Sequence, residues 1–137
     1  MTDEKEYRSV VFVCETEVDV NEGDRGIAEI QLNPRPFIMT SMRHEIVKDG
    51  NAPTPPVQDG MYRINWTIDD QTQFFKGPAP LARSYLGSVD TGIWKNLDNP
   101  IEIRGSQNFA VTIINALPGR ANPITVQIQL HGVERIR

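Results

Sequence analysis

The 137-residue sequence has few of the residues that build covalent or metal-bound sites. It has one cysteine, Cys14, so no internal disulfide can form. Cys14 lies in the apolar run Val10–Cys14, which favours a small buried thiol over a reactive one. The only histidines, His44 and His131, lie far apart without a His-x-His or Cys-x-x-Cys pattern. We therefore expect no metal site and no cofactor.

Long apolar segments are also missing. No stretch approaches the roughly 18 apolar residues that a membrane helix needs. The N-terminal sequence MTDEKEYR is charged and lacks the apolar centre of a signal peptide. The lack of cysteine pairs is compatible with a reducing cytoplasm. We expect a soluble, non-secreted protein with no membrane partner.

Positive charge is neither abundant nor clustered. The formal net charge is −4, and the 14 Lys and Arg residues are spread along the chain. A protein that binds nucleic acid usually presents a basic face to the phosphates. We therefore expect no nucleic-acid partner.

Catalytic patterns are missing as well. Ser84, Ser88 and Ser106 lie in predicted loops without a Gly-x-Ser-x-Gly context, and no glycine-rich phosphate loop is present. The adjacent acids Asp69 and Asp70 could serve glycoside hydrolysis or bind calcium, but at a strand end this pair is more typical of a turn. We expect no catalytic residues and no enzyme activity.

What the sequence does contain is period-two alternation of apolar residues, which is typical of strands with one buried face. The clearest cases are Met61–Asp69 and Ile124–His131. The other expected strands are Tyr7–Val20, Ile27–Leu32, Phe37–Val47, Gln73–Lys76, Pro100–Arg104 and Gln107–Asn115.

The pattern predicts an all-β protein: an antiparallel β-sandwich of seven to nine strands, of the jelly-roll type, without substantial helix. Residues 1–6 are expected to form a flexible arm before a single domain, 7–137. Leu81–Leu86 is either a short strand or one helical turn. The long 48–60 connection is either functional or flexible. A shift of the apolar positions to Val133 after Gly132 predicts a β-bulge there.

Several large apolar residues exceed what one buried face can hold. Phe74 and Phe75 are adjacent in a short predicted strand, so one should face away from the core. Phe37 and Met39 share a face opposite to that of Met42. These extra side chains predict an interface, unless a bulge turns one of them inward.

Two further features complete the candidate interface. Trp94 either covers the end of the sandwich or belongs to a sugar-binding loop with Asp90 and Asp98. The outward row of the last strand is uncharged and lacks a protective lysine, so this strand is predicted to pair with another subunit. The candidate interface residues are Phe37, Met39, Phe74, Phe75, Trp94, Gln127, Gln129 and His131.

The segments MYRINWTIDD, NPIEIRGSQNFAVTIINALP and ITVQIQLHGVE, within 61–134, resemble small β-sandwich proteins of tailed-bacteriophage particles. These are called cement, decoration or minor capsid proteins. The resemblance implies a jelly-roll or related fold, pairing into dimers, a clamp on neighbouring major capsid subunits, and no catalytic residues. The acidic net charge suits the outside of a shell, because packaged DNA repels a negative chain.

Our leading hypothesis is a structural virion protein on the capsid exterior, made in the host cytoplasm. Its expected partners are the major capsid protein and further copies of itself, as a dimer or larger oligomer. The alternative is a carbohydrate- or receptor-binding sandwich that uses Trp94 or exposed phenylalanines. An enzyme of unrecognised type is the third hypothesis.

Overall fold

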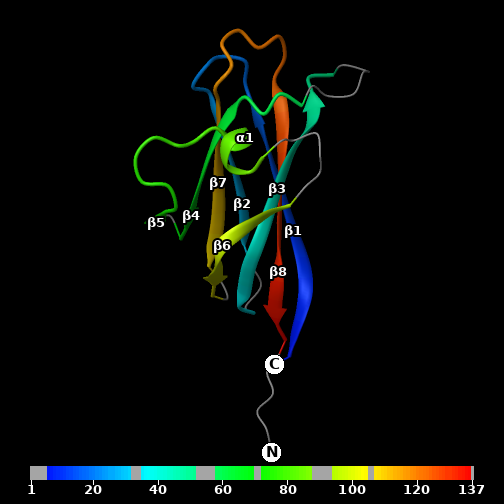
Figure 1. Cartoon of the computed structure of the whole chain (residues 1–137). Coiled ribbons are helices and arrows are strands. Elements are labelled where there is room, and N and C mark those ends of the chain that lie inside the picture. Colours follow the sequence, from blue (N-terminus) through cyan, green and yellow to red (C-terminus); the bar gives the residue numbers. More distant parts are fainter. Residues whose placement is uncertain are drawn as a thin grey trace, which may run out of the picture.

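In the computed structural model the chain forms a sandwich of two four-stranded antiparallel sheets (Figure 1). The structure describes residues 6–31, 35–51, 58–69, 72–87, 94–104 and 107–136. The first sheet has the order β1-β8-β3-β6, with bounds Tyr7–Val18, Ile124–Arg135, Phe37–Asp49 and Lys95–Ile103. The second has the order β2-β7-β4-β5, with bounds Arg25–Gln31, Asn108–Asn115, Tyr62–Ile68 and Thr72–Gln73. The prediction of an all-β antiparallel sandwich is confirmed; the jelly-roll type stays a prediction.

The core lies between the sheets, where alternate side chains of both point inward. Seven of the inward residues on β8 and β4 are at most 1% exposed: Ile124, Val126, Ile128, Leu130, Tyr62, Ile64 and Trp66. The alternation predicted for these two strands is therefore confirmed. Burying a large apolar side chain contributes about 1.5–3 kcal/mol, so these rows account for much of the stability.

Several strands differ in extent from the prediction, and β6 and β5 are the cases that bear on the site. β6 begins at Lys95 rather than Pro100, and it is an edge strand. Pro100 lies between the paired residues Asn96 and Ile101, where the β3–β6 register shifts, so its missing N–H removes no ladder bond. β5 has only two residues, because the chain bends after Gln73. Of the two alternatives for Leu81–Leu86, the structure contains the helical turn, α1 (Ala82–Tyr85).

The predicted bulge in β8 is wrong. β8 alternates without interruption to Arg135 and pairs with β1 in unbroken register. The β3–β8 register shifts instead at two places in β3, between Met39 and Ser41 and between Ile46 and Lys48. Gly132 faces inward beside the first of these shifts, and a Cβ there would collide with the Ile38 carbonyl oxygen. The apolar residue after it, Val133, simply belongs to the outward row.

Both ends of the described chain lie at the same end of the sandwich (Figure 1). The Ile136 N–H donates to the Glu6 carbonyl oxygen at 2.9 Å. Among the described residues, no helix is long and apolar enough to cross a membrane. Several positions considered above lie outside the described residues: 1–5, 52–57, Asp70, Ser88, Asp90 and Ser106.

We predict that Gly132→Ala lowers the free energy of unfolding by about 2–3 kcal/mol, because the new methyl group forces β3 and β8 apart. Urea unfolding followed by fluorescence measures the change. Ser9→Ala, at the exposed position opposite Val133, is the control and should stay within about 0.5 kcal/mol. Equal stability of the two variants would contradict the close approach at Gly132.

Candidate functional site

Four aromatic rings meet at the side of the sandwich where β5 and β6 form the sheet edges. The Phe74 ring stacks on Trp66 with 4.2 Å between centroids. Phe75 meets Tyr85 of α1 edge-on at 4.8 Å and Trp66 at 5.3 Å. Both phenylalanines thus turn toward Trp66, so the prediction that they point to opposite faces of a strand is wrong. The reason is that the strand ends at Gln73, before either of them.

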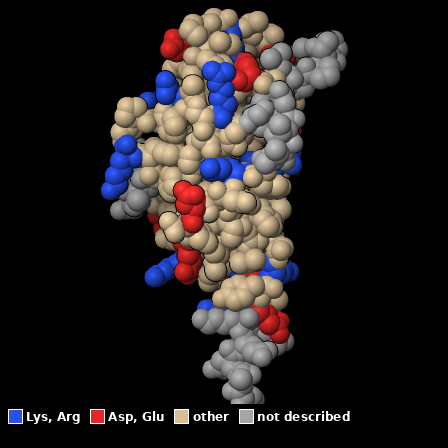
Figure 2. Space-filling view, in the orientation of Figure 1, with Lys and Arg blue, Asp and Glu red and all other residues tan. Residues whose placement is uncertain are grey.

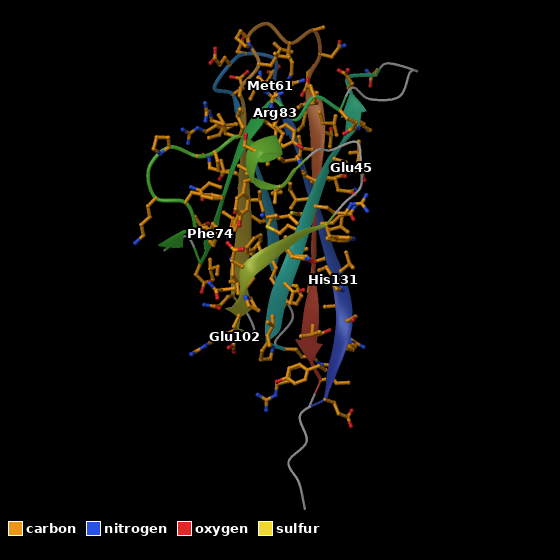
Figure 3. The ribbon with its side chains drawn as sticks, in the orientation of Figure 1. Glu45, Met61, Phe74, Arg83, Glu102 and His131 are labelled. Atoms are coloured by element: carbon orange, nitrogen blue, oxygen red, sulfur yellow. The ribbon has the colours of Figure 1, made fainter. Side chains whose placement is uncertain are left out.

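A groove of about 230 Å³ opens beside these rings, and we call it the aromatic groove. Its walls come from the bend after β5, from α1 and from β6, and its residues are Phe74, Tyr85, Leu97, Asp98, Asn99, Pro100 and Ile101. Phe74 is 41% exposed, so the groove presents a large apolar side chain to solvent. Figure 3 shows Phe74 at one side of the molecule, apart from His131 and Glu45.

Two charged side chains, Lys95 and Asp98, lie near Tyr85 of the aromatic groove. The Lys95 Nζ lies 5.7 Å from the centre of the Tyr85 ring. Burial, and then the nearby Asp98 carboxylate, raise the pKa of Tyr85, so its hydroxyl remains a neutral hydrogen-bonding group. The groove therefore suits an apolar side chain with an adjacent N–H donor that can reach Asp98.

The predicted row on β8 lies on the outer face of the first sheet, but β8 is not an edge strand. It pairs with β1 on one side and with β3 on the other. The prediction that β8 adds a strand from another subunit is therefore wrong, because strand order leaves its backbone no open side. The side chains form a ladder: Gln129 Nε2 donates to Gln127 Oε1 at 2.8 Å, and Gln127 Nε2 donates to Glu15 at 3.3 Å.

Trp94 and His131 come together on this outer face, with ring centroids 5.7 Å apart. The Arg43 guanidinium carbon lies 5.5 Å from the Trp94 ring centre, and Arg43 Nε is buried without a hydrogen-bond partner. Ser41 Oγ lies 3.3 Å from His131 Nδ1. Ser41 is only 4% exposed, so its hydroxyl is not accessible as a nucleophile.

Phe37 and Met39 lie in the core, and their predicted interface role is wrong for the folded chain. Both are 0% exposed, as is Met42. The register shift between Met39 and Ser41 lets Met39 and Met42 both face inward, which is the alternative that the sequence left open. Phe37 packs edge-on against Phe12 at 5.0 Å.

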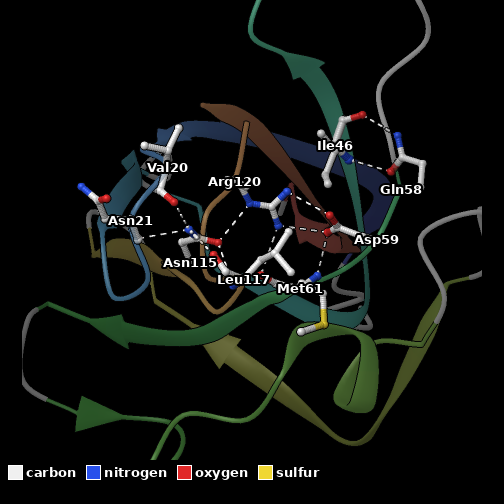
Figure 4. Close-up of polar contacts among 9 residues, drawn as sticks. All are labelled: Val20, Asn21, Ile46, Gln58, Asp59, Met61, Asn115, Leu117 and Arg120. Carbon is white, nitrogen blue, oxygen red and sulfur yellow. Dashed lines mark hydrogen bonds and ion pairs between the residues drawn. The ribbon is translucent and has the colours of Figure 1, made fainter. Parts of the chain in front are cut away.

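A polar cluster closes the end of the sandwich opposite the chain termini (Figures 1 and 4). Arg120 is 9% exposed and binds Asp59 through both terminal nitrogens, at 2.9 and 3.0 Å. Its Nε donates to Asn115 Oδ1 at 3.0 Å, and Nη2 donates to the Met61 carbonyl oxygen at 3.2 Å. Burial alone would raise the pKa of Asp59, but the hydrogen bonds from Arg120 and the Met61 N–H outweigh it and lower that pKa.

The cluster fastens loops rather than exposing groups for binding. Asn115 Nδ2 donates to the carbonyl oxygens of Val20, Asn21 and Leu117 at 3.0–3.1 Å. Because these donors and acceptors are engaged within the chain, the cluster holds three connections together. The residue spacing gave no sign of it, since Asp59 and Arg120 are 61 positions apart.

A second buried polar link joins the two sheets. His44 of β3 bonds through Nδ1 to the Tyr62 hydroxyl of β4, and its Nε2 lies 2.8 Å from the Gly87 carbonyl oxygen. A carbonyl can only accept, so Nε2 carries the proton and Nδ1 accepts from Tyr62. Burial lowers the pKa of His44, although the bond to Gly87 acts in the opposite direction.

Among the described residues, no three His, Cys, Asp or Glu side chains gather as a metal site. On the face in Figure 2, basic and acidic side chains are interspersed among uncharged surface. In comparisons with known proteins, no family model matches the chain and no curated protein matches it. We take the aromatic groove and the outer face of the first sheet as candidate binding surfaces, because both expose aromatic side chains beside polar groups.

We predict that Arg120→Met lowers the free energy of unfolding by about 3 kcal/mol, because it leaves Asp59 without its paired cation and leaves Asn115 Oδ1 with the Leu117 N–H alone as donor. Urea unfolding at neutral pH measures the loss. The exposed Arg104→Met is the matched control and should change stability by less than about 0.5 kcal/mol. A loss below about 1 kcal/mol at Arg120 would contradict a structural role for the pair.

We also predict that the His44 link weakens in mild acid. Its folded pKa is below the unfolded value near 6.5, so the unfolded state binds more protons once the pH falls below about 6.5. His44 should therefore contribute a loss of about 1 kcal/mol between pH 7.5 and pH 5.5. The free energy of unfolding is measured across this range for the natural chain and for His44→Gln. Parallel pH profiles for the two proteins would rule out this origin.

Proposed function

We propose that the chain is a structural protein of a tailed-bacteriophage particle, a cement protein that binds the outside of the capsid lattice and stabilises it. The observation that carries the proposal is the aromatic groove, a preformed recess that presents the exposed ring of Phe74. Its exposed Phe74 is held in place by stacking on the buried Trp66, so binding costs little side-chain ordering. We assign the groove to an apolar side chain of the major capsid protein.

The strand pairing supports the finer jelly-roll assignment. β1 pairs with β8, β2 with β7, β3 with β6, and β4 with β5. Rolling up one long hairpin of eight strands brings together the first and last strand, the second and seventh, and so on inward. This double-sheet arrangement is common among viral capsid domains, which supports the proposal by analogy of fold alone.

The proposed site of action is the exterior of the virion. The net charge of −4 suits a surface away from packaged DNA. A shell presents many equivalent sites, so self-associated copies that each bind weakly through one groove gain avidity from simultaneous contacts.

A second candidate function, glycan or receptor binding, rests on the outer face of the first sheet. Trp94, Arg43 and the glutamine ladder combine an aromatic ring with planar polar groups, which is the chemistry that binds sugars. Quenching of tryptophan fluorescence by glycans, without binding to shells, would favour this function.

The test is cosedimentation of the purified chain with empty assembled shells of the phage that encodes it. We predict saturable binding to shells and at least about tenfold weaker binding for Phe74→Asp, since a carboxylate in the groove is desolvated beside Asp98. Ile27→Asp is the matched control, because Ile27 is 61% exposed on β2, at the opposite edge of the second sheet from β5 and Phe74. Circular dichroism confirms that both variants fold. Failure of the natural chain to cosediment would overturn the proposed function.

A further inference from the structure

β1 is an open edge of the first sheet. Within the described part of the chain it is hydrogen-bonded to β8 on one side and to no strand on the other, although Gly26 of β2 lies close to the Glu17 carbonyl oxygen near its end. It forms the outermost ribbon of its sheet in Figure 1. Its register with β8 runs unbroken from Tyr7 to Val18, so no bulge twists the edge away. The strand contains no Lys and no Pro, the residues that commonly protect an exposed edge.

The backbone groups that face the open side can be identified from the pairing. In an antiparallel ladder, opposite residues that exchange hydrogen bonds alternate with opposite residues that do not. The Ile136 N–H bonds to the Glu6 carbonyl, which fixes the even-numbered residues of β1 as those bonded to β8. The N–H and C=O groups of Ser9, Val11 and Val13 therefore point away from the sheet.

Three odd-numbered residues of β1 carry exposed apolar side chains. Tyr7, Val11 and Val13 are 45%, 47% and 53% exposed. A strand added at this edge would satisfy the open backbone groups and cover the two valines at once.

The charges of β1 indicate which strand fits. Its acidic residues, Glu15 and Glu17, are odd-numbered and lie on the outer face, whereas its basic residue, Arg8, is even-numbered and is paired with Glu134 of β8. An antiparallel copy of β1 keeps the glutamates of the two strands apart, because Glu15 then lies opposite Tyr7 or Ser9. A parallel copy in register would instead place each glutamate beside its equivalent.

We propose that β1 pairs with β1 of a second copy, antiparallel about a twofold axis, so that the two first sheets become one continuous eight-stranded sheet. The outer faces of both copies must lie on one side, so odd residues oppose odd residues. The twofold axis then passes between the two copies of Val11 or between the two copies of Phe12. Either register places Val11 and Val13 opposite uncharged residues of the partner strand. The inference rests on the self-association within the proposed function and gives it a contact.

Pairing at β1 leaves the aromatic groove free. β1 and β6 are the two opposite edges of the first sheet, and the groove is lined from the β6 side. A dimer through β1 would therefore present one groove at each end of the continuous sheet.

The test measures mass by light scattering and backbone amide exchange by NMR on the full chain, over a range of protein concentrations. We expect a species of twice the 15.5 kDa chain mass. As the dimer forms, the amides of Ser9, Val11 and Val13 should exchange at least about tenfold more slowly. The amides of Val10 and Phe12 are bonded to β8 and should be protected at every concentration.

A double variant, Val11→Lys with Val13→Lys, places charges on the outer face without disturbing the core and should weaken the dimer at least about tenfold. Ile27→Lys is the matched control on the other sheet and should dimerise normally.

The proposal is overturned if the chain stays monomeric, if a dimer forms without protecting the three amides, or if the double variant dimerises normally. Protection that appears only on adding shells would also overturn it, because a capsid strand would then be the partner. The concentration series contains no shells, so a failure of the chain to dimerise can be distinguished from a failure to bind capsids.

Discussion

The pairing of β8 on both of its sides is the constraint on which the rest of this fold depends. Its inward row, Ile124 to Leu130, forms one wall of the core, and its hydrogen bonds align β1 and β3. Once β8 occupies an inner position, β1 and β6 become the edges of that sheet. The two edges have different surroundings: β6 is flanked by the aromatic groove, while β1 presents the exposed side chains of Val11 and Val13.

The local pattern of the sequence was sufficient to predict much of the fold. The alternation in Tyr62–Ile68 and Ile124–Leu130 identified strands and their buried faces. Successive side chains of a strand point to opposite faces, so apolar residues at every second position mark the buried face. The alternation does not indicate which strands are neighbours in a sheet. For that reason the uncharged row on β8 suggested an edge, although the open edge belongs to β1, where Val11 and Val13 are the exposed residues.

The candidate site was predictable only in part, for the same physical reason. The sequence indicated that one of Phe74 and Phe75 would face outward, without showing which. The stacking of Phe74 on Trp66 depends on the bend after Gln73. Met39 was misplaced because the register shift between Met39 and Ser41 changes the face of the residues that follow it in β3. The Arg120–Asp59 pair joins segments 61 positions apart, and no local pattern encodes such a contact.

The adjacent ends of β1 and β8 have a mechanical consequence. A force that pulls Glu6 away from Ile136 loads the hydrogen bonds between these strands one pair after another, as in opening a zipper. A force applied across the sheet, from β1 toward β6, acts along the hydrogen bonds, and all the pairs of each ladder share it. A molecule held by its two sheet edges should therefore withstand greater tension than the same molecule held by its two chain ends.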